Sequence, residues 1–401
     1  MITVEEARAR ILDGLRPVAD ETVPLAAAWN RVSAAPVHAR LTQPPQDVSA
    51  MDGYALRAAD GALGARLRLA GTAPAGHPWA GTLGRGEILR LFTGSVVPSG
   101  ADGILLQEDA RAEDGHVVVG EAVVAGRHIR RAGQDFTAGD IMVPAGRRLT
   151  ARDIGLIAAA NHPWVAVHRR PRVAILATGD EIVLPGEPIP PGGIVSSNAH
   201  ALAALVQGAG GEAVVRPIVP DDSAAIAAAA LATTDCDLLV TTGGASVGEH
   251  DLVQGALQSV GMVLDFWKIA MRPGKPLMHG RLGALPMIGL PGNPVSALVT
   301  AILFVLPAVA RLAGLPGETL PSTQAELATP LAANDQRADH LRARLAPRDG
   351  GLPLASPFDR QDSAMLRLFT QADALILRPP HAPPLAAGAT VPIIRLDALG
   401  I

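Results

Sequence analysis

The chain has 401 residues, a formal net charge of −4, and 48% hydrophobic but only 3% aromatic residues. This length predicts two to four domains with sizeable cores. The negative charge and the few aromatic side chains exclude a general affinity for nucleic acid or for an anionic membrane, so neither is an expected partner. The one cysteine, Cys236, excludes a disulfide framework and a thiolate metal site, and without a targeting signal we expect a cytoplasmic protein.

The N-terminal part of the chain changes character along its length. Thr3 is a candidate helix N-cap with Glu6 three residues later, and apolar residues then recur at helical spacing. Across residues 41–140, short apolar runs alternate with Gly, Pro and Asp, which predicts a β-rich domain of short strands. A second helical stretch, ARDIGLIAAAN, follows Thr150.

From about residue 171, strands and helices alternate. The strands are RVAILAT, EAVVRPIV, DLLVTT and PMIGL, and an apolar helical segment follows each of them, which predicts a doubly wound parallel sheet. The last helical segment, PVSALVTAILFVLPAVARLAG, is interrupted by Pro307 and Arg311, so we expect a buried core helix and not a membrane span. Residues 318–401 return to short strands and prolines, which predicts a small β-barrel or sandwich.

Three loops that follow strands of the predicted sheet share the features of an anion site. Because the carboxyl ends of neighbouring parallel strands lie about 5 Å apart, these loops can share one crevice. Glycine N–H groups, hydroxyls and carboxylates in such a crevice suit a phosphate with Mg²⁺ beside it. For any one loop, a plain strand-to-helix turn is an equal alternative, and three in succession favour the site. The candidate residues are Thr178, Gly179, Asp180, Glu181, Gly243, Gly244, Ser246, Asp251, Pro291, Gly292 and Asn293.

A basic turn lies between the second and the third of these loops. The segment WKIAMRPGKPLMHG places Lys268, Arg272 and Lys275 around a Pro-Gly turn. A rigid turn with these cations predicts a clamp for a multiply charged anion, and a solvated basic loop is the alternative.

The β-rich region adds polar residues at turns. Asp52 lies in SAMDGYALRAAD, Thr93 follows a short strand in LFTGSVVPSG, and Asp135 lies in the polar loop RRAGQDFTAGD. An ordinary Asp-Gly turn is the common explanation for the first string. The sequence has no histidine pair at zinc spacing, no P-loop lysine and no Gly-x-Ser-x-Gly elbow.

Seven motifs occur in a diagnostic order: MDGYA, FTG, RRAGQD, LATGDEIV, TTGGASVGEHD, MRPGKP and GLPGNPVSA. On these motifs the chain resembles the MoeA family of molybdopterin molybdenumtransferases, which includes the insertase domain of gephyrin. The resemblance runs from about residue 3 to the C-terminus. The strings TGDE and GGxSxG are shared with MogA-type adenylyltransferases, whereas MDGYA favours the insertase.

The resemblance implies a multidomain fold of α/β and β parts. A doubly wound parallel MogA-like α/β domain is central, the β-rich domain is inserted in an elongated helical linker domain, and a small β-barrel is C-terminal. The expected bounds are 1–40 plus 141–168 for the linker domain, 41–140 for the β-rich domain, 169–317 for the α/β domain and 318–401 for the barrel.

The resemblance also implies a reaction. Adenylylated molybdopterin and molybdate give molybdenum cofactor and AMP, with Mg²⁺ as the metal ion. Two other functions stay open: a MogA-type molybdopterin adenylyltransferase that uses ATP, and a non-catalytic pterin-binding scaffold protein. A homodimer is implied, as is contact with a MogA-type adenylyltransferase and with molybdoenzyme maturation proteins. The sequence does not decide between molybdate and tungstate, because the two oxyanions are nearly identical in size and charge.

Matched position by position, the resemblance implies roles for particular residues. The catalytic set is Asp52, Thr93, Asp135, Glu181 and Asp251, with the first two supplied by the β-rich domain across a dimer interface. The Mg²⁺ ligands are Glu181, Asp251 and either Asp221 or Asp222. The substrate-binding set is Thr178, Gly179, Asp180, Gly243, Gly244, Ser246, Arg272, Lys275, Pro291, Gly292, Asn293, Arg342 and Ser363.

Two positions depart from the family pattern. Arg272 stands where a lysine is usual, and the planar fork of arginine would alter the contact. Asp362, Ser363 and Ala364 stand where Gly-Ser-Gly is common, which adds a negative charge beside an expected anion site.

Overall fold

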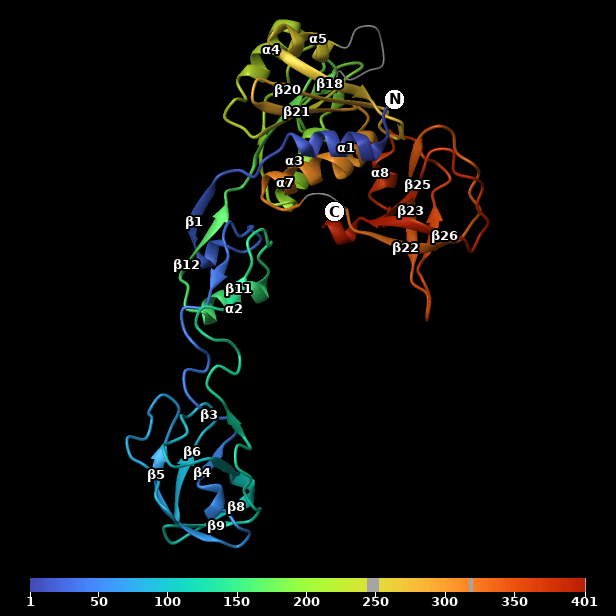
Figure 1. The fold of residues 1–401 in the computed structure, drawn as a ribbon. Coiled ribbons are helices and arrows are strands. Elements are labelled where there is room, and N and C mark those ends of the chain that lie inside the picture. The colour runs from blue at the N-terminus through green and yellow to red at the C-terminus, as the bar shows by residue number, and fades with distance from the viewer. Residues whose placement is uncertain (244–251, 317–319, 401) are drawn as a thin grey trace.

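The computed structural model describes residues 1–243, 252–316 and 320–400, and these form an elongated molecule (Figure 1). An α/β part lies at one end with the C-terminal barrel beside it. The β-rich part lies at the opposite end, and a slender middle part made of N-terminal strands connects the two. The multidomain fold expected from the sequence is therefore confirmed.

The first helix, α1 (Val4–Asp13), packs with the α/β part. Thr3 caps it as predicted, because Thr3 Oγ1 accepts a hydrogen bond from the Glu6 N–H at 3.1 Å. The Glu6 carboxylate turns to Arg10 at 2.6 Å, one helical turn on. The buried face of α1 includes Ile11, which belongs to the same apolar cluster as the core of the α/β sheet.

The slender middle part is built from pairs of chain segments that are far apart in the sequence. Strand β1 (Asp20–Pro24) pairs antiparallel with β12 (Trp164–His168), and β2 (Val37–His38) pairs with β11 (Ile141–Val143). Helix α2 (Ala151–Ala159) packs on this unit, and a reciprocal capping box of Thr150 and Asp153 fixes its start.

The β-rich part is inserted through two chain crossings that hydrogen-bond to each other. The N–H of Gln43 donates to Phe136 O at 2.9 Å, and the N–H of Gly133 donates to Pro44 O at 2.9 Å. Beyond them, β3 (Val48–Ser49) pairs with β10 (Ile129–Arg130). The main sheet has the order β7-β4-β6-β5-β9-β8. Its strands are β4 (Gly53–Leu56), β5 (Arg66–Ala73), β6 (Glu87–Leu91), β7 (Gly103–Leu106), β8 (Ala110–Glu113) and β9 (His116–Val119).

The α/β part has a six-stranded sheet in the order β16-β13-β17-β21-β20-β18. Four adjacent strands are parallel, as predicted: β16 (Glu212–Val215), β13 (Arg172–Ala177), β17 (Leu238–Thr242) and β21 (Leu285–Leu290). Helices α3 (Asn198–Gly208), α6 (Pro294–Thr300) and α7 (Leu306–Leu312) cover one face with α1. Helices α4 (Ser223–Leu231) and α5 (Leu252–Ser259) cover the other.

Two antiparallel strands that the sequence did not predict extend the parallel sheet at one edge. The strands β20 (Pro276–Leu282) and β18 (Met262–Lys268) continue the sheet in antiparallel pairing. The physical reason is connection length: only Gly283 and Ala284 separate β20 from β21, which is too short for a helical crossover. The predicted basic loop is thus the connection between two strands.

The last apolar helical stretch is continuous but irregular. It runs through α6, a π-helical segment (Ala301–Val305) and α7, so that the irregular turn lies just before Pro307, which lacks an N–H donor. By length and composition Pro294–Leu312 could cross a membrane, but 83% of its apolar window is buried inside the protein. This burial agrees with the predicted core helix.

The C-terminal part is a closed five-stranded barrel, which confirms that prediction. Closure follows because β23 pairs on one side with β24 and on the other with β25. A short strand, β19 (Met271–Arg272), leaves the α/β part and pairs parallel with β23, and α8 (Leu366–Phe369) packs near α6. The barrel strands are β22 (Ser322–Leu327), β23 (Ala338–Ala346), β24 (Leu354–Pro357), β25 (Ala374–Arg378) and β26 (Thr390–Arg395).

The capping box of α2 gives a stability prediction. Thr150→Ala removes the oxygen that accepts the Asp153 N–H and should lower the free energy of unfolding by about 1 kcal/mol, measured by urea denaturation. Thr22→Ala, on an exposed position of β1, is the matched control and should change it by less than about 0.5 kcal/mol. Equal unfolding midpoints for the two variants would contradict the capping role.

Candidate active site

A cleft of about 580 Å³ lies at the carboxyl ends of β13, β17 and β21. This volume is in the range of small-molecule sites, and the position is the usual one for ligands of parallel α/β sheets. Its wall includes a flap in which β14 (Ile182–Val183) pairs parallel with β15 (Ile194–Val195). Predicted residues that line the cleft are Glu181, Gly243, Pro291, Gly292 and Asn293.

Asn198, the first residue of α3, joins two of the loops. Its Nδ2 donates to Thr242 Oγ1 at 2.9 Å and to Gly292 O at 2.8 Å. The amide therefore fixes the second and third loops relative to each other at the start of α3. The sequence could not predict these two hydrogen bonds, because the partners lie 44 and 94 residues away from Asn198. The one local indication was an Asn directly after a loop at the edge of the sheet.

The loop after β17 fits closely against the loop after β13. Gly243 has φ +95°, and a Cβ on it would lie 2.5 Å from the carbonyl oxygen of Thr178. Glycine is required here by both conformation and space. Thr178 is buried, and its Oγ1 has no hydrogen-bond partner among the described residues.

The acidic residues of the first loop serve different purposes. Asp180 Oδ1 accepts a hydrogen bond from the Asp221 N–H at 3.0 Å, which holds the loop before α4 to the sheet edge. The Glu181 carboxylate folds back over Gly179, where an added Cβ would lie 2.6 Å from Glu181 Oε2. Asp222 is the N-cap of α4 and accepts from the Ala225 N–H at 2.8 Å. Asp222 is thereby occupied in capping.

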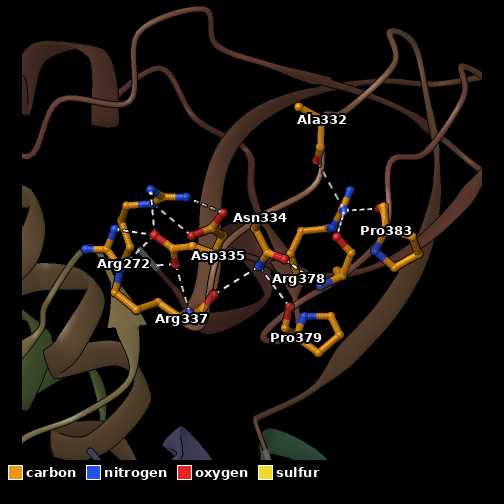
Figure 2. Close-up of polar contacts among 10 residues, drawn as sticks. Arg272, Ala332, Asn334, Asp335, Arg337, Arg378, Pro379 and Pro383 are labelled. Carbon is orange, nitrogen blue, oxygen red and sulfur yellow. Dashed lines mark hydrogen bonds and ion pairs between the residues drawn. The ribbon is translucent and has the colours of Figure 1, made fainter.

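The basic turn carries cations with different surroundings. Arg272 makes a two-pronged contact with Asp339 of the barrel, from Nε to Oδ1 at 2.9 Å and from Nη2 to Oδ2 at 2.8 Å. Figure 2 shows that its guanidinium also faces Asp335, at 3.8 Å. Lys268 Nζ lies 3.5 Å from the centre of the Trp267 ring. Lys275 is half-buried and precedes a proline that lines the cleft.

The barrel brings Ser363 to the third loop. Asn293 Nδ2 donates to Ser363 Oγ at 2.9 Å, and the Val295 N–H donates to Ser363 O at 3.0 Å. Next to it, the Asp362 carboxylate accepts the Ala364 N–H at 2.8 Å, so the added charge closes its own turn.

Arg342 lies next to the loop that carries Ser363. It is fully buried, and it donates to Gln361 Oε1 at 3.1 Å and to Asp362 O at 2.8 Å. Burial lowers the pKa of its guanidinium. In this conformation Arg342 supports the loop that carries Ser363 and does not line the cleft.

Asp52 and Thr93 meet in the β-rich part, as members of one site should. Both the N–H and the Oγ1 of Thr93 donate to Asp52 Oδ1, at 2.7 and 2.8 Å. These hydrogen bonds, the backbone one first, lower the pKa of Asp52. Asp135 is exposed on one of the two crossings, where its N–H donates to Gln43 O at 3.1 Å. Within one chain this part lies at the opposite end from the cleft (Figure 1).

Three predicted site residues, Gly244, Ser246 and Asp251, lie outside the described residues. Within residues 1–243, 252–316 and 320–400 there is no group of three or more side chains suited to hold a metal ion. The structure therefore brings together Glu181, Gly243, Asn293 and Ser363 around the cleft, and Asp52 with Thr93 at a second place.

The fold and the cleft define an α/β protein that binds a small ligand at the carboxyl ends of its parallel strands. Residues 2–161 match the MoeA N-terminal region (domains I and II), 174–311 match a probable molybdopterin binding domain, and 324–396 match the MoeA C-terminal region (domain IV). The three matches correspond in order to the middle and β-rich parts, the α/β part and the C-terminal barrel.

Similar proteins agree with these matches. A molybdopterin molybdenumtransferase of Haemophilus influenzae is 34% identical over 98% of both chains, and one of a Nostoc species is 40% identical over 77% of this chain and 74% of its own. A solved structure of the MoeA protein from Pyrococcus horikoshii, 26% identical, superposes with a TM-score of 0.85 over 98% of this chain and 99% of its own. The chain belongs to the MoeA family.

Gly243 gives a prediction for the shape of the cleft. Gly243→Ala should lower the free energy of unfolding by about 1–3 kcal/mol, because an alanine there has an unfavourable φ and meets the Thr178 carbonyl. Gly208→Ala, in α3 with open space around it, should instead raise it by about 0.5–1 kcal/mol. Urea unfolding of both variants tests the opposite signs, and a neutral Gly243 variant would refute the packing argument.

The Asp52–Thr93 contact gives a prediction for titration. Thr93→Val removes the hydroxyl donor and keeps the N–H donor, so the pKa of Asp52 should rise part of the way towards its ordinary value. Carboxyl carbon NMR titration measures this rise. The pKa of Asp140, which Thr137 lowers in a separate loop, should not move.

Because folding lowers the pKa of Asp52, the contribution of Asp52 to stability is present above its unfolded pKa and is lost as pH falls through its folded pKa.

Proposed function

We propose that this protein is a molybdenum insertase of molybdenum cofactor biosynthesis, a molybdopterin molybdenumtransferase. It converts adenylylated molybdopterin and molybdate to molybdenum cofactor and AMP, in the cytoplasm and with Mg²⁺. The observation that carries the proposal is the cleft at the ends of β13, β17 and β21, which lies within the part that matches a molybdopterin binding domain. The names of the full-length relatives support the same activity.

The cleft offers groups that suit the two halves of such a substrate. Gly243 and Gly292 bring backbone close to the ligand, and Thr242 and Ser296 add hydroxyls for phosphate oxygens. On the flap, Ile194 is 55% exposed and also lines the cleft. Such an apolar lip suits the flat face of a pterin ring, whereas the glycine loops suit the diphosphate.

The described residues fit Mg²⁺ only as part of a site that the substrate completes. Mg²⁺ takes one or two carboxylates together with phosphate oxygens, and Glu181 is the acidic side chain among the described residues that lines the cleft. Asp221, on the loop held by Asp180, and Asp251 are the other proposed ligands, because Asp222 already caps α4. When bound, Mg²⁺ would offset charge on the phosphoanhydride that is cleaved.

A homodimer with shared sites follows from the proposal. The β-rich part, which carries Asp52 and Thr93, lies at the opposite end of the molecule from the α/β part (Figure 1), so in this proposal a second copy presents them at the cleft. The lowered pKa of Asp52 favours its charged carboxylate, which suits a group that faces a metal ion or another cation. Contact with a MogA-type adenylyltransferase and with molybdoenzyme maturation proteins belongs to the same proposal.

The direct test uses purified protein with adenylylated molybdopterin, molybdate and Mg²⁺. Release of AMP that depends on molybdate or tungstate is the expected result. Release that is independent of both oxyanions would refute the insertase function. Formation of adenylylated molybdopterin from ATP would favour the adenylyltransferase, and binding without turnover would favour the scaffold protein. Competition between the two oxyanions establishes the preferred metal.

Glu181 and Asp52 give a prediction for activity. Glu181→Gln and Asp52→Asn keep the shape of each side chain and remove its charge, and each should lower kcat by about 10²–10⁴-fold without unfolding the protein. Glu212→Gln, an exposed carboxylate on edge strand β16, is the control and should keep wild-type turnover. Full turnover in both test variants would contradict the assigned site.

Mixing the two variants tests whether sites are shared. If Asp52 and Glu181 of one site come from different copies, a mixed dimer of the two variants has one intact site. An exchanged equimolar mixture should then recover about one quarter of wild-type activity, since half of the dimers are mixed. No recovery, after exchange is demonstrated with tagged chains, would refute a shared site.

A further inference from the structure

We propose that Arg272 and Asp339 form a positioning pair that fixes the turn from Arg272 to Pro276 at the cleft, and that Arg272 does not itself bind molybdate or phosphate. This inference rests on the proposed insertase function. It assigns a role to Asp339, which had none. It also changes the role of Arg272: the resemblance implied anion binding, whereas here Arg272 attaches the turn to the barrel.

The side-chain contact has the geometry of a strong ion pair. Two parallel N–H···O bonds of 2.9 and 2.8 Å join the guanidinium to the Asp339 carboxylate, which is buried at 4% exposure. A buried carboxylate without its cation is strongly unfavourable, so Asp339 holds Arg272 in place. Nearby, Arg337 binds Asp335 at 2.7 Å within the barrel (Figure 2).

The backbone reinforces the pair. Strand β19 pairs with β23 so that Arg272 lies opposite Asp339, and the Ala338 N–H donates to Ala270 O at 2.9 Å. Met271, between these contacts, is fully buried. The start of the turn is therefore hydrogen-bonded to barrel strand β23, although the residues on both sides of it in the sequence form strands of the α/β sheet.

The other end of the turn reaches the cleft. Gly274 has φ +106° and packs on α6, where an added Cβ would lie 2.4 Å from Thr300 Cγ2. Pro276 lines the cleft and begins β20. Lys275, between these two, is thus carried by a turn that is anchored at Asp339 on one side and at the cleft wall on the other. A shift of the anchor would displace Lys275.

The arginine at this position follows from the pair. A lysine ammonium can make one such contact, but only the planar guanidinium matches both oxygens of a carboxylate. Arginine therefore fits Asp339 in this chain better than the usual lysine would. About half of the Arg272 side chain remains exposed, so direct anion binding by its outer face is the competing role.

The two roles predict opposite effects of Asp339→Asn. If Arg272 binds the oxyanion, loss of the competing carboxylate should leave the KM for molybdate unchanged or lower it. If the pair positions the turn, Asp339→Asn and Arg272→Ala should each lower kcat/KM for molybdate by about 10- to 100-fold. The double variant should then be no worse than either single variant.

Two further variants keep the test decisive. Arg272→Lys retains the charge and loses the fork, so positioning predicts a loss close to that of Arg272→Ala, whereas anion binding predicts activity near wild type. This comparison decides the matter if Asp339→Asn does not fold. Arg337→Ala removes a guanidinium that pairs within the barrel and should leave kcat/KM unchanged.

Amide hydrogen exchange supplies a readout that does not depend on activity. Exchange at residues 269–276 should increase in Asp339→Asn and Arg272→Lys, but not in Arg337→Ala. Unchanged exchange and a lower molybdate KM in Asp339→Asn would overturn the inference. If wild-type protein lacks molybdate-dependent turnover, the insertase function fails instead, and exchange alone still tests the pair.

Discussion

The parallel pairing of β13, β17 and β21 is the constraint on which the site depends. It brings the ends of three strands to one edge, although the chain between them spans more than a hundred residues. The loops that follow are then close enough for one amide, that of Asn198, to bond to two of them. Helices on both faces bury nearly all residues of these strands, so the edge cannot shift without loss of the core.

Local patterns predicted the parts of this protein that depend on nearby residues. Apolar runs predicted the parallel strands, and capping residues predicted the starts of helices. Gly/Pro turns predicted the loops that line the cleft. The antiparallel edge was missed although β18 and β20 are apolar runs, because the Pro-Gly turn between them led to the interpretation of the whole segment as a basic loop. The partners of Arg272 and Asn198 lie 67 and up to 94 residues away, and no local signal shows which charge or carbonyl a side chain will meet. The burial of Arg342 has the same cause.

Both departures from the family pattern have partners in the structure. Arg272 faces a carboxylate that fits its fork, and Asp362 uses its charge on the amide of Ala364, so neither is an isolated replacement. Both charged side chains have a partner within hydrogen-bond distance. The barrel and the α/β part are joined at two places near the cleft, by Asp339 and by Ser363. Barrel position and cleft shape are thus coupled.

The doubled crossing into the β-rich part makes that part a stiff lever. A single connecting segment would swivel about its backbone bonds, but two segments bonded at Gln43, Pro44 and Phe136 resist rotation. The β-rich part lies at the far end of this connection (Figure 1). Asp135 lies on this crossing, so a substitution there that disturbs the backbone would tilt the whole β-rich part and displace Asp52 with it. Such a variant would lose activity as if a catalytic group had been removed, although the cause would be the displacement of Asp52.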